Sequence, residues 1–63
     1  MPLIHVGLMS GRTEEKLEEL IAELTKTAEK TLNAPRETIR VIVYEVPKAN
    51  WGIGGVTAKK LGR

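Results

Sequence analysis

The chain contains no cysteine, no aspartate and no phenylalanine, and it has one histidine, one tryptophan and one tyrosine among 63 residues. Without cysteine it has neither disulfides nor thiolate metal ligands, which is compatible with a cytosolic protein. One histidine and no aspartate leave no Ser-His-Asp triad. These absences exclude disulfide-stabilised folds and hydrolases that depend on such a triad.

Ligands for a metal ion are equally scarce. His5 is the single histidine, and seven of the eight glutamates lie on the surface of a predicted helix or in a turn, Glu45 being the exception. A zinc site needs three or four such side chains close together. We therefore predict no metal site.

Long apolar runs and charge of one sign are also missing. No segment approaches the roughly 20 apolar residues that cross a bilayer, and the start MPLIHVGLM is too short for the apolar region of a signal peptide. The formal net charge is +2, with lysines and glutamates interspersed and no basic run. We expect a cytoplasmic protein that binds neither membrane nor nucleic acid.

The length of the chain predicts one small domain over residues 1–63. A chain of this size buries only about 60% of the surface that it exposes when unfolded, so its core is marginal. Disulfides and metal ions are not available to strengthen it. Oligomerisation is the remaining way to do so.

The middle of the chain has the pattern of an amphipathic helix. Thr13 is the predicted N-cap, and Asn33 can end the helix in a left-handed conformation before Pro35 prevents its continuation. The apolar spacing of three and four residues predicts one buried stripe. Its members are Leu17, Leu20, Ile21, Leu24, Ala28 and Leu32.

Two segments flank this helix with the pattern of strands, PLIHVGLM over 2–9 and TIRVIVYEV over 38–46. The second is rich in β-branched residues, and both are largely apolar on their two faces. A short turn is expected at PRET, before the second strand. The glycine-rich tail over 47–63 indicates turns and a short hairpin.

Strand, helix and strand form a βαβ unit, which predicts an α/β (α+β) fold with parallel strands and a right-handed crossover. One helix covers only one face of the sheet. The other face must therefore pack against another chain, sheet against sheet. The pattern alone predicts an obligate oligomer.

Four residues are ambiguous in the sequence alone. Pro2 is either the tolerated start of a strand or, once Met1 is removed, a basic secondary amine. Arg40 lies in an otherwise apolar strand, where it faces a pocket and binds a carboxylate, reaches solvent at the strand end, or pairs with a glutamate of a neighbouring chain. His5 is more simply a hydrogen-bonded interface residue than a catalyst. Trp51 is equally well a subunit contact or a pocket wall.

Four motifs together resemble the 4-oxalocrotonate tautomerase (2-hydroxymuconate tautomerase) family. They are Met1-Pro2, Gly11-Arg12 after the first strand, Arg40 in TIRVIV, and WGIGG over 51–55. Each motif is weak by itself. Their presence at matching spacings over nearly the whole chain makes the resemblance specific.

The resemblance implies an isomerase of aromatic hydrocarbon catabolism that converts 2-hydroxymuconate to 2-oxo-3-hexenedioate without metal or organic cofactor. Pro2, freed of Met1, would act as general base and then as acid. Arg40 would bind the carboxylate and oxygen at the reacting end, Arg12 the distal carboxylate, and Trp51 would line the apolar pocket. The implied assembly is a homohexamer, a trimer of dimers.

Two departures from the family pattern leave the substrate open. Trp51 stands where phenylalanine is common, and Ser10 replaces a frequent glutamate. A related tautomerase acting on phenylenolpyruvate-like enols, and an enzyme that adds water to halogenated acrylates, are nearby alternatives. A different alternative is a non-catalytic oligomeric module, in which the arginines form ion pairs between subunits.

Strand geometry makes a further prediction about the site. With a rise of roughly 3.3 Å per residue, Pro2 and Arg12 lie on the order of 25–30 Å apart in one chain. Arg12 must therefore reach Pro2 from another subunit, whereas Arg40 starts at the same end as Pro2. An α-amino group has a pKa of about 7.7–8.0, and neighbouring arginines disfavour its protonated form, which lowers that pKa and suits a general base.

Overall fold

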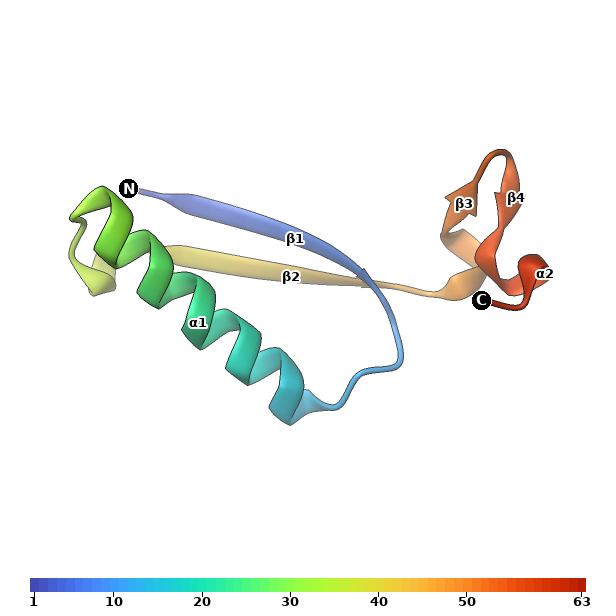
Figure 1. Ribbon diagram of the computed structural model, residues 1–63, viewed down its shortest axis with the longest axis horizontal. Helices are drawn as coiled ribbons and strands as arrows, with labels where there is room; N and C mark the ends of the chain where they lie inside the picture. Colours follow the sequence, from blue (N-terminus) through green and yellow to red (C-terminus); the bar gives the residue numbers. More distant parts are fainter.

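The computed structural model describes residues 1–63 and has the predicted α+β fold. Along the chain the regular elements are β1 (Leu3–Met9), α1 (Glu14–Leu32), the 3₁₀ turn η1 (Arg36–Thr38), β2 (Arg40–Val46), the 3₁₀ turn η2 (Lys48–Asn50), β3 (Gly52–Ile53), β4 (Val56–Thr57) and α2 (Ala58–Leu61). Figure 1 shows the βαβ unit as one layer of sheet with α1 beside it, and the C-terminal hairpin beyond its far end.

The strands β1 and β2 pair in parallel, as predicted, with a register that runs from Leu3 opposite Arg40 to Met9 opposite Val46. Successive side chains of a strand point to opposite faces, and burial follows this alternation along most of both strands. The half-buried set that faces α1 comprises Ile4, Val6, Leu8, Val41 and Val43. The predicted two-faced strands are therefore confirmed, and only one of their faces is covered.

Helix α1 begins and ends where the sequence indicates. The Thr13 hydroxyl accepts a hydrogen bond from the Lys16 amide at 3.2 Å, which satisfies one of the free donors of the first turn. Asn33 ends the helix with a φ of 55°, in the left-handed region. The turn η1 follows Pro35, so the short turn expected at PRET is present too.

The tail contains the predicted hairpin and a helix that the sequence analysis missed. Gly54 and Gly55 connect β3 to β4 with φ values of 58° and 88°, and a tight hairpin turn with two positive φ angles favours glycine at both positions. Thr57 then caps the four-residue helix α2, its hydroxyl accepting from the Lys60 amide at 3.1 Å. The signal for this helix was the threonine before Ala-Lys-Lys.

The single chain does not close a core of its own. Only Ala28, Ile39 and Ala58 are buried. The molecule measures 43 × 24 × 13 Å, and its radius of gyration is 14.6 Å, against about 11 Å for a compact domain of this length. Its elongated shape comes from the hairpin, which projects past the end of the sheet (Figure 1).

The sheet face that lies away from α1 is apolar and open. Leu3 is 52% exposed, Ile42 41% and Tyr44 49%. Beside them His5 stacks on Tyr44 with ring centroids 5.6 Å apart, and His5 Nδ1 is hydrogen-bonded to the Tyr44 hydroxyl at 2.9 Å. We call this surface, formed by Leu3, His5, Ile42 and Tyr44, the outer sheet face.

Neither α1 nor α2 has the combination of length and apolar character that crossing a membrane requires.

Candidate active site

Pro2 and Arg40 lie together at the edge where both parallel strands begin. The Arg40 amide donates a hydrogen bond to the Pro2 carbonyl at 3.0 Å, directly before the first residue pair of the sheet, Leu3 and Arg40. The register therefore places Arg40 at the same end as Pro2, as strand direction predicts. This backbone bond also fixes the proline from its carboxyl side.

The Arg40 guanidinium is held by main-chain carbonyls. Its Nη1 donates to the Glu37 carbonyl at 2.6 Å and, with a longer contact, to the Ile39 carbonyl at 3.4 Å. A guanidinium has five N–H donors in a rigid plane, and these two bonds use only one of its nitrogens. The edge formed by Nε and Nη2 is the one suited to a carboxylate, which binds such an edge through two parallel hydrogen bonds.

Pro2 itself is half-buried, and Met1 before it is 85% exposed. Because Met1 makes few contacts with the rest of the chain, its removal would cost little packing energy. It would leave the proline nitrogen at the surface of this edge, next to the backbone of Arg40.

Arg12 and Trp51 belong to the opposite end of the molecule. Arg12 follows β1, and Trp51 follows β2 and η2. The six residue steps of β1 alone cover roughly 20 Å, so neither residue shares an edge with Pro2 in the same chain. Figure 1 shows the N-terminus and the hairpin at the two ends of the long axis.

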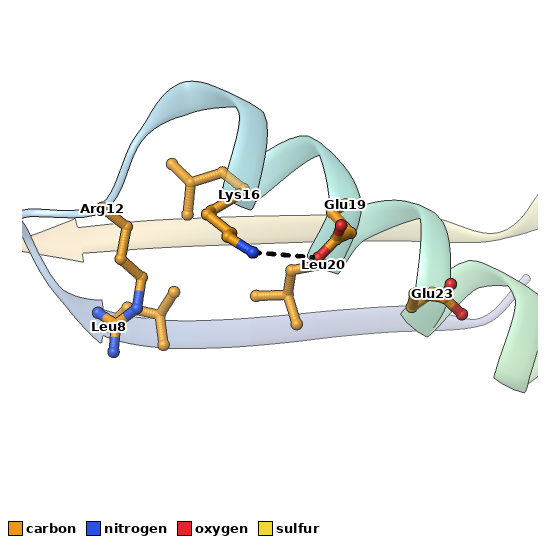
Figure 2. Close-up of a pocket in the computed structure, with 7 residues that line it drawn as sticks. Leu8, Arg12, Lys16, Glu19, Leu20 and Glu23 are labelled. Atoms are coloured by element: carbon orange, nitrogen blue, oxygen red, sulfur yellow. Dashed lines mark ion pairs between the residues drawn. The ribbon is translucent and has the colours of Figure 1, made fainter.

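Arg12 lines a groove of about 600 Å³ between the end of β1 and the first half of α1. Its Nη1 donates to the Met9 carbonyl at 3.0 Å. Figure 2 shows the Lys16 side chain directed toward Glu19, with Leu20 beside them. The distance between Lys16 Nζ and Glu19 Oε1 is 3.7 Å. The groove is lined by Leu8, Arg12, Lys16, Leu17, Glu19, Leu20 and Glu23. Pro2 is not part of this groove, and of the residues that line it the sequence analysis named only Arg12 as a site residue.

Trp51 is half-buried and anchored through its backbone. Its amide donates to the Lys48 carbonyl at 3.3 Å, and its carbonyl accepts from the Ala58 amide at 2.7 Å. These two bonds tie the Trp51 backbone to η2 on one side and to α2 on the other. No three metal-binding side chains lie close enough together in the chain to form a cluster.

One chain thus presents half of the predicted site at each end. Pro2, the predicted base, and Arg40 lie at the start of the sheet, whereas Arg12 and Trp51 lie beyond the end of the strands. Two copies of the chain with opposed strand directions would bring the two halves together.

Residues 2–60 match the family of tautomerase enzymes, and the chain belongs to this family. Membership of this family supports an isomerase as the class of protein. Among curated relatives, the chain is 57% identical over 56 residues to a probable tautomerase of Ralstonia nicotianae, covering 89% of this chain and 80% of the relative. It is 43% identical over 63 residues to the 2-hydroxymuconate tautomerase of Pseudomonas putida, covering both chains fully.

Solved structures agree with this assignment. A 4-oxalocrotonate tautomerase isozyme from Methylibium petroleiphilum superposes with a TM-score of 0.93 at 47% identity, covering 98% of this chain and all of that one. A heterohexameric 4-oxalocrotonate tautomerase from Chloroflexus aurantiacus superposes with a TM-score of 0.91 at 31% identity, covering 97% of this chain and 98% of that one.

Proposed function

We propose that the chain is a single tautomerase domain over residues 1–63 that isomerises an unsaturated 2-hydroxy or 2-oxo dicarboxylate, typically 2-hydroxymuconate to 2-oxo-3-hexenedioate. The observation that carries this proposal is the position of Pro2 beside Arg40 in a chain of the tautomerase family. The similarity to the 2-hydroxymuconate tautomerase of Pseudomonas putida supports the choice of substrate.

In this mechanism Pro2 carries the proton. Once Met1 is removed, the proline nitrogen takes the proton from the 2-hydroxyl group and delivers it to C5, so that the electrons of the dienol shift and no group is gained or lost. Arg40 binds the carboxylate and the oxygen at the reacting end. Its charge stabilises the dienolate as negative charge develops on that oxygen, which is often the largest contribution to catalysis in such sites.

The remaining residues come from other subunits in this proposal. Arg12 holds the distal carboxylate and Trp51 forms an apolar wall, each supplied by a chain whose opposite end meets Pro2. The open outer sheet face and the elongated chain support a homo-oligomer, and the heterohexameric relative from Chloroflexus aurantiacus supports an assembly of six chains. The arrangement that we propose for these six chains is a trimer of dimers.

A comparison of two enols tests the substrate class. We expect kcat/KM for 2-hydroxymuconate to exceed that for phenylenolpyruvate by about ten- to a hundredfold, because only the dicarboxylate offers a second charged partner to Arg12. The preference should collapse in Arg12→Ala. Faster conversion of phenylenolpyruvate would instead identify a related tautomerase, and no conversion of either enol would favour the non-catalytic module.

Mixing two defective chains tests whether the site is shared. Pro2→Ala and Arg12→Ala chains, each strongly impaired alone, are unfolded together and refolded at equal concentrations. If each site takes these two residues from different chains, about a quarter of the sites in random oligomers receive both intact residues, and activity recovers to that extent. If Pro2 and Arg12 acted within one chain, the mixture would stay as impaired as its parts.

A further inference from the structure

The connection between α1 and β2 is braced by an ion pair that links two elements. Glu29, near the end of α1, receives a hydrogen bond from Nη2 of Arg36 at the start of η1, with 3.0 Å between Oε1 and Nη2. The other two ion pairs of the chain lie within α1, between residues three apart, at 3.7 and 3.8 Å. The pair between Glu29 and Arg36 is thus the shortest of the three, and it alone fixes one element against another.

The other hydrogen bonds that shape the turn η1 lie within the turn itself. The Thr38 amide and hydroxyl both donate to the Pro35 carbonyl, at 3.0 and 2.7 Å, and the Ile39 amide donates to the Arg36 carbonyl at 3.1 Å. These bonds are local to the turn. They set its internal shape but not its position relative to α1.

The position of η1 matters because this turn holds the Arg40 guanidinium. The shortest bond of that guanidinium, at 2.6 Å, goes to the carbonyl of Glu37, the middle residue of η1. The amide of the same arginine is bonded to Pro2. A shift of η1 would therefore move the guanidinium relative to the proline.

We propose that Glu29 and Arg36 are positioning residues, which act through η1 to hold the Arg40 guanidinium beside Pro2 in the orientation that binds the substrate carboxylate. This inference rests on the proposed function for its catalytic consequence, but not for its structural one. Neither residue touches the substrate. Their role is to keep the Glu37 carbonyl in place.

Glu29→Gln tests the inference, with Glu18→Gln as the matched control. Both changes remove one negative charge from α1, and Glu18 is exposed and belongs to none of the three ion pairs. We expect hydrogen exchange at the Thr38 and Ile39 amides to become about two- to fivefold faster in Glu29→Gln, the range that a partly exposed ion pair can supply. The control should exchange like the unmodified protein.

The kinetic effect should follow the same pattern. In Glu29→Gln we expect kcat/KM for the dicarboxylate to fall about two- to fivefold, mainly through KM, and the difference from the unmodified protein to shrink in 1 M salt, which screens the pair. The double variant Glu29→Arg with Arg36→Glu, which reverses the two charges, should restore both the slow hydrogen exchange and kcat/KM. Glu29→Arg alone should have faster hydrogen exchange and a lower kcat/KM than Glu29→Gln.

The outcomes separate the two hypotheses. An unmodified protein without tautomerase activity would overturn the proposed function, while the exchange measurement would still decide whether the pair holds η1. An active protein in which Glu29→Gln exchanges and turns over like Glu18→Gln would overturn this inference alone. A lower KM in Glu29→Gln would also overturn it, since it would mean that a freed Arg36 binds substrate itself.

Discussion

A variant in which a Gly-Ser dipeptide is attached in front of Pro2 is expected to have a kcat/KM about a hundred- to ten-thousandfold lower than the chain that begins at Pro2. This factor is the usual contribution of a general base. Acylation turns the proline nitrogen into an amide, whose lone pair is delocalised into the carbonyl and takes no proton. The same loss is expected wherever Met1 stays attached. Mass spectrometry of each sample beside an enol tautomerisation assay measures both quantities.

Two controls separate loss of the base from loss of the assembly. The blocked chain should keep the oligomeric mass of the unblocked one, because Met1 is 85% exposed and contributes little packing in the chain. Pro2→Ala, with Met1 removed, keeps a primary amine at the same place and should lose less activity than the blocked chain. Full activity in a sample whose every chain is blocked would eliminate Pro2 as the catalyst.

The pH dependence of kcat/KM should also identify the free proline amine as the base. The base must be unprotonated, so kcat/KM of the unblocked chain rises with pH through the pKa of the free amine and then levels off. In the proposed site, arginines around the amine would disfavour its protonated form, so we expect the rise to lie below the ordinary pKa of 7.7–8.0 of an α-amino group. The residual activity of the blocked chain should lack this rise.

Ile42→Glu is expected to break the oligomer and abolish activity together. Ile42 lies in the middle of the outer sheet face and is 41% exposed in the single chain. If that face packs against another sheet, an unpaired carboxylate there costs several kcal/mol at each copy of the interface. Because the proposed site takes Arg12 from another subunit, dissociation also removes the arginine that binds the distal carboxylate of the substrate.

The measurement is mass in solution, in multiples of the 7.0 kDa chain, alongside tautomerase activity. Thr31→Glu is the matched control, since it places the same charge at an exposed position of α1 and should leave both properties unchanged. An Ile42→Glu protein that remains assembled and fully active would show that the outer sheet face is not a subunit interface.

Local signals predicted most of the fold because each acts through near neighbours. Thr13 satisfies one of the free donors of the first helical turn, and Asn33 adopts the left-handed conformation that ends the helix. The alternation along both strands needs only the two-residue period of extended backbone. The short helix α2 was missed because its four residues carry no apolar period, and its one signal is the threonine that caps it.

The site was less accessible to sequence reasoning. From the sequence alone Arg40 had three competing roles, and the resemblance to a family favoured one of them. That a carbonyl of η1 holds its guanidinium could not be foreseen, since Glu37 contributes there through its backbone and not through its side chain. The groove beside Arg12 was missed for a similar reason. Lys16 and Glu19, which are 70% and 68% exposed, look like ordinary solvated charges.

The order of side chains by itself determined the βαβ unit, the ends of its long helix, the excess of apolar surface and the placement of Pro2 and Arg12 at opposite ends of β1. All of these depend on periodicity, capping and the fixed rise of a strand. Only the tertiary structure decided which groups meet. In it, the Arg40 amide is bonded to the Pro2 carbonyl, the Arg40 guanidinium to the Glu37 carbonyl of η1, and Glu29 to Arg36. The first of these contacts joins segments distant in sequence, where strand direction and register set the distance. The other two depend on how the chain turns between α1 and β2, which composition does not specify.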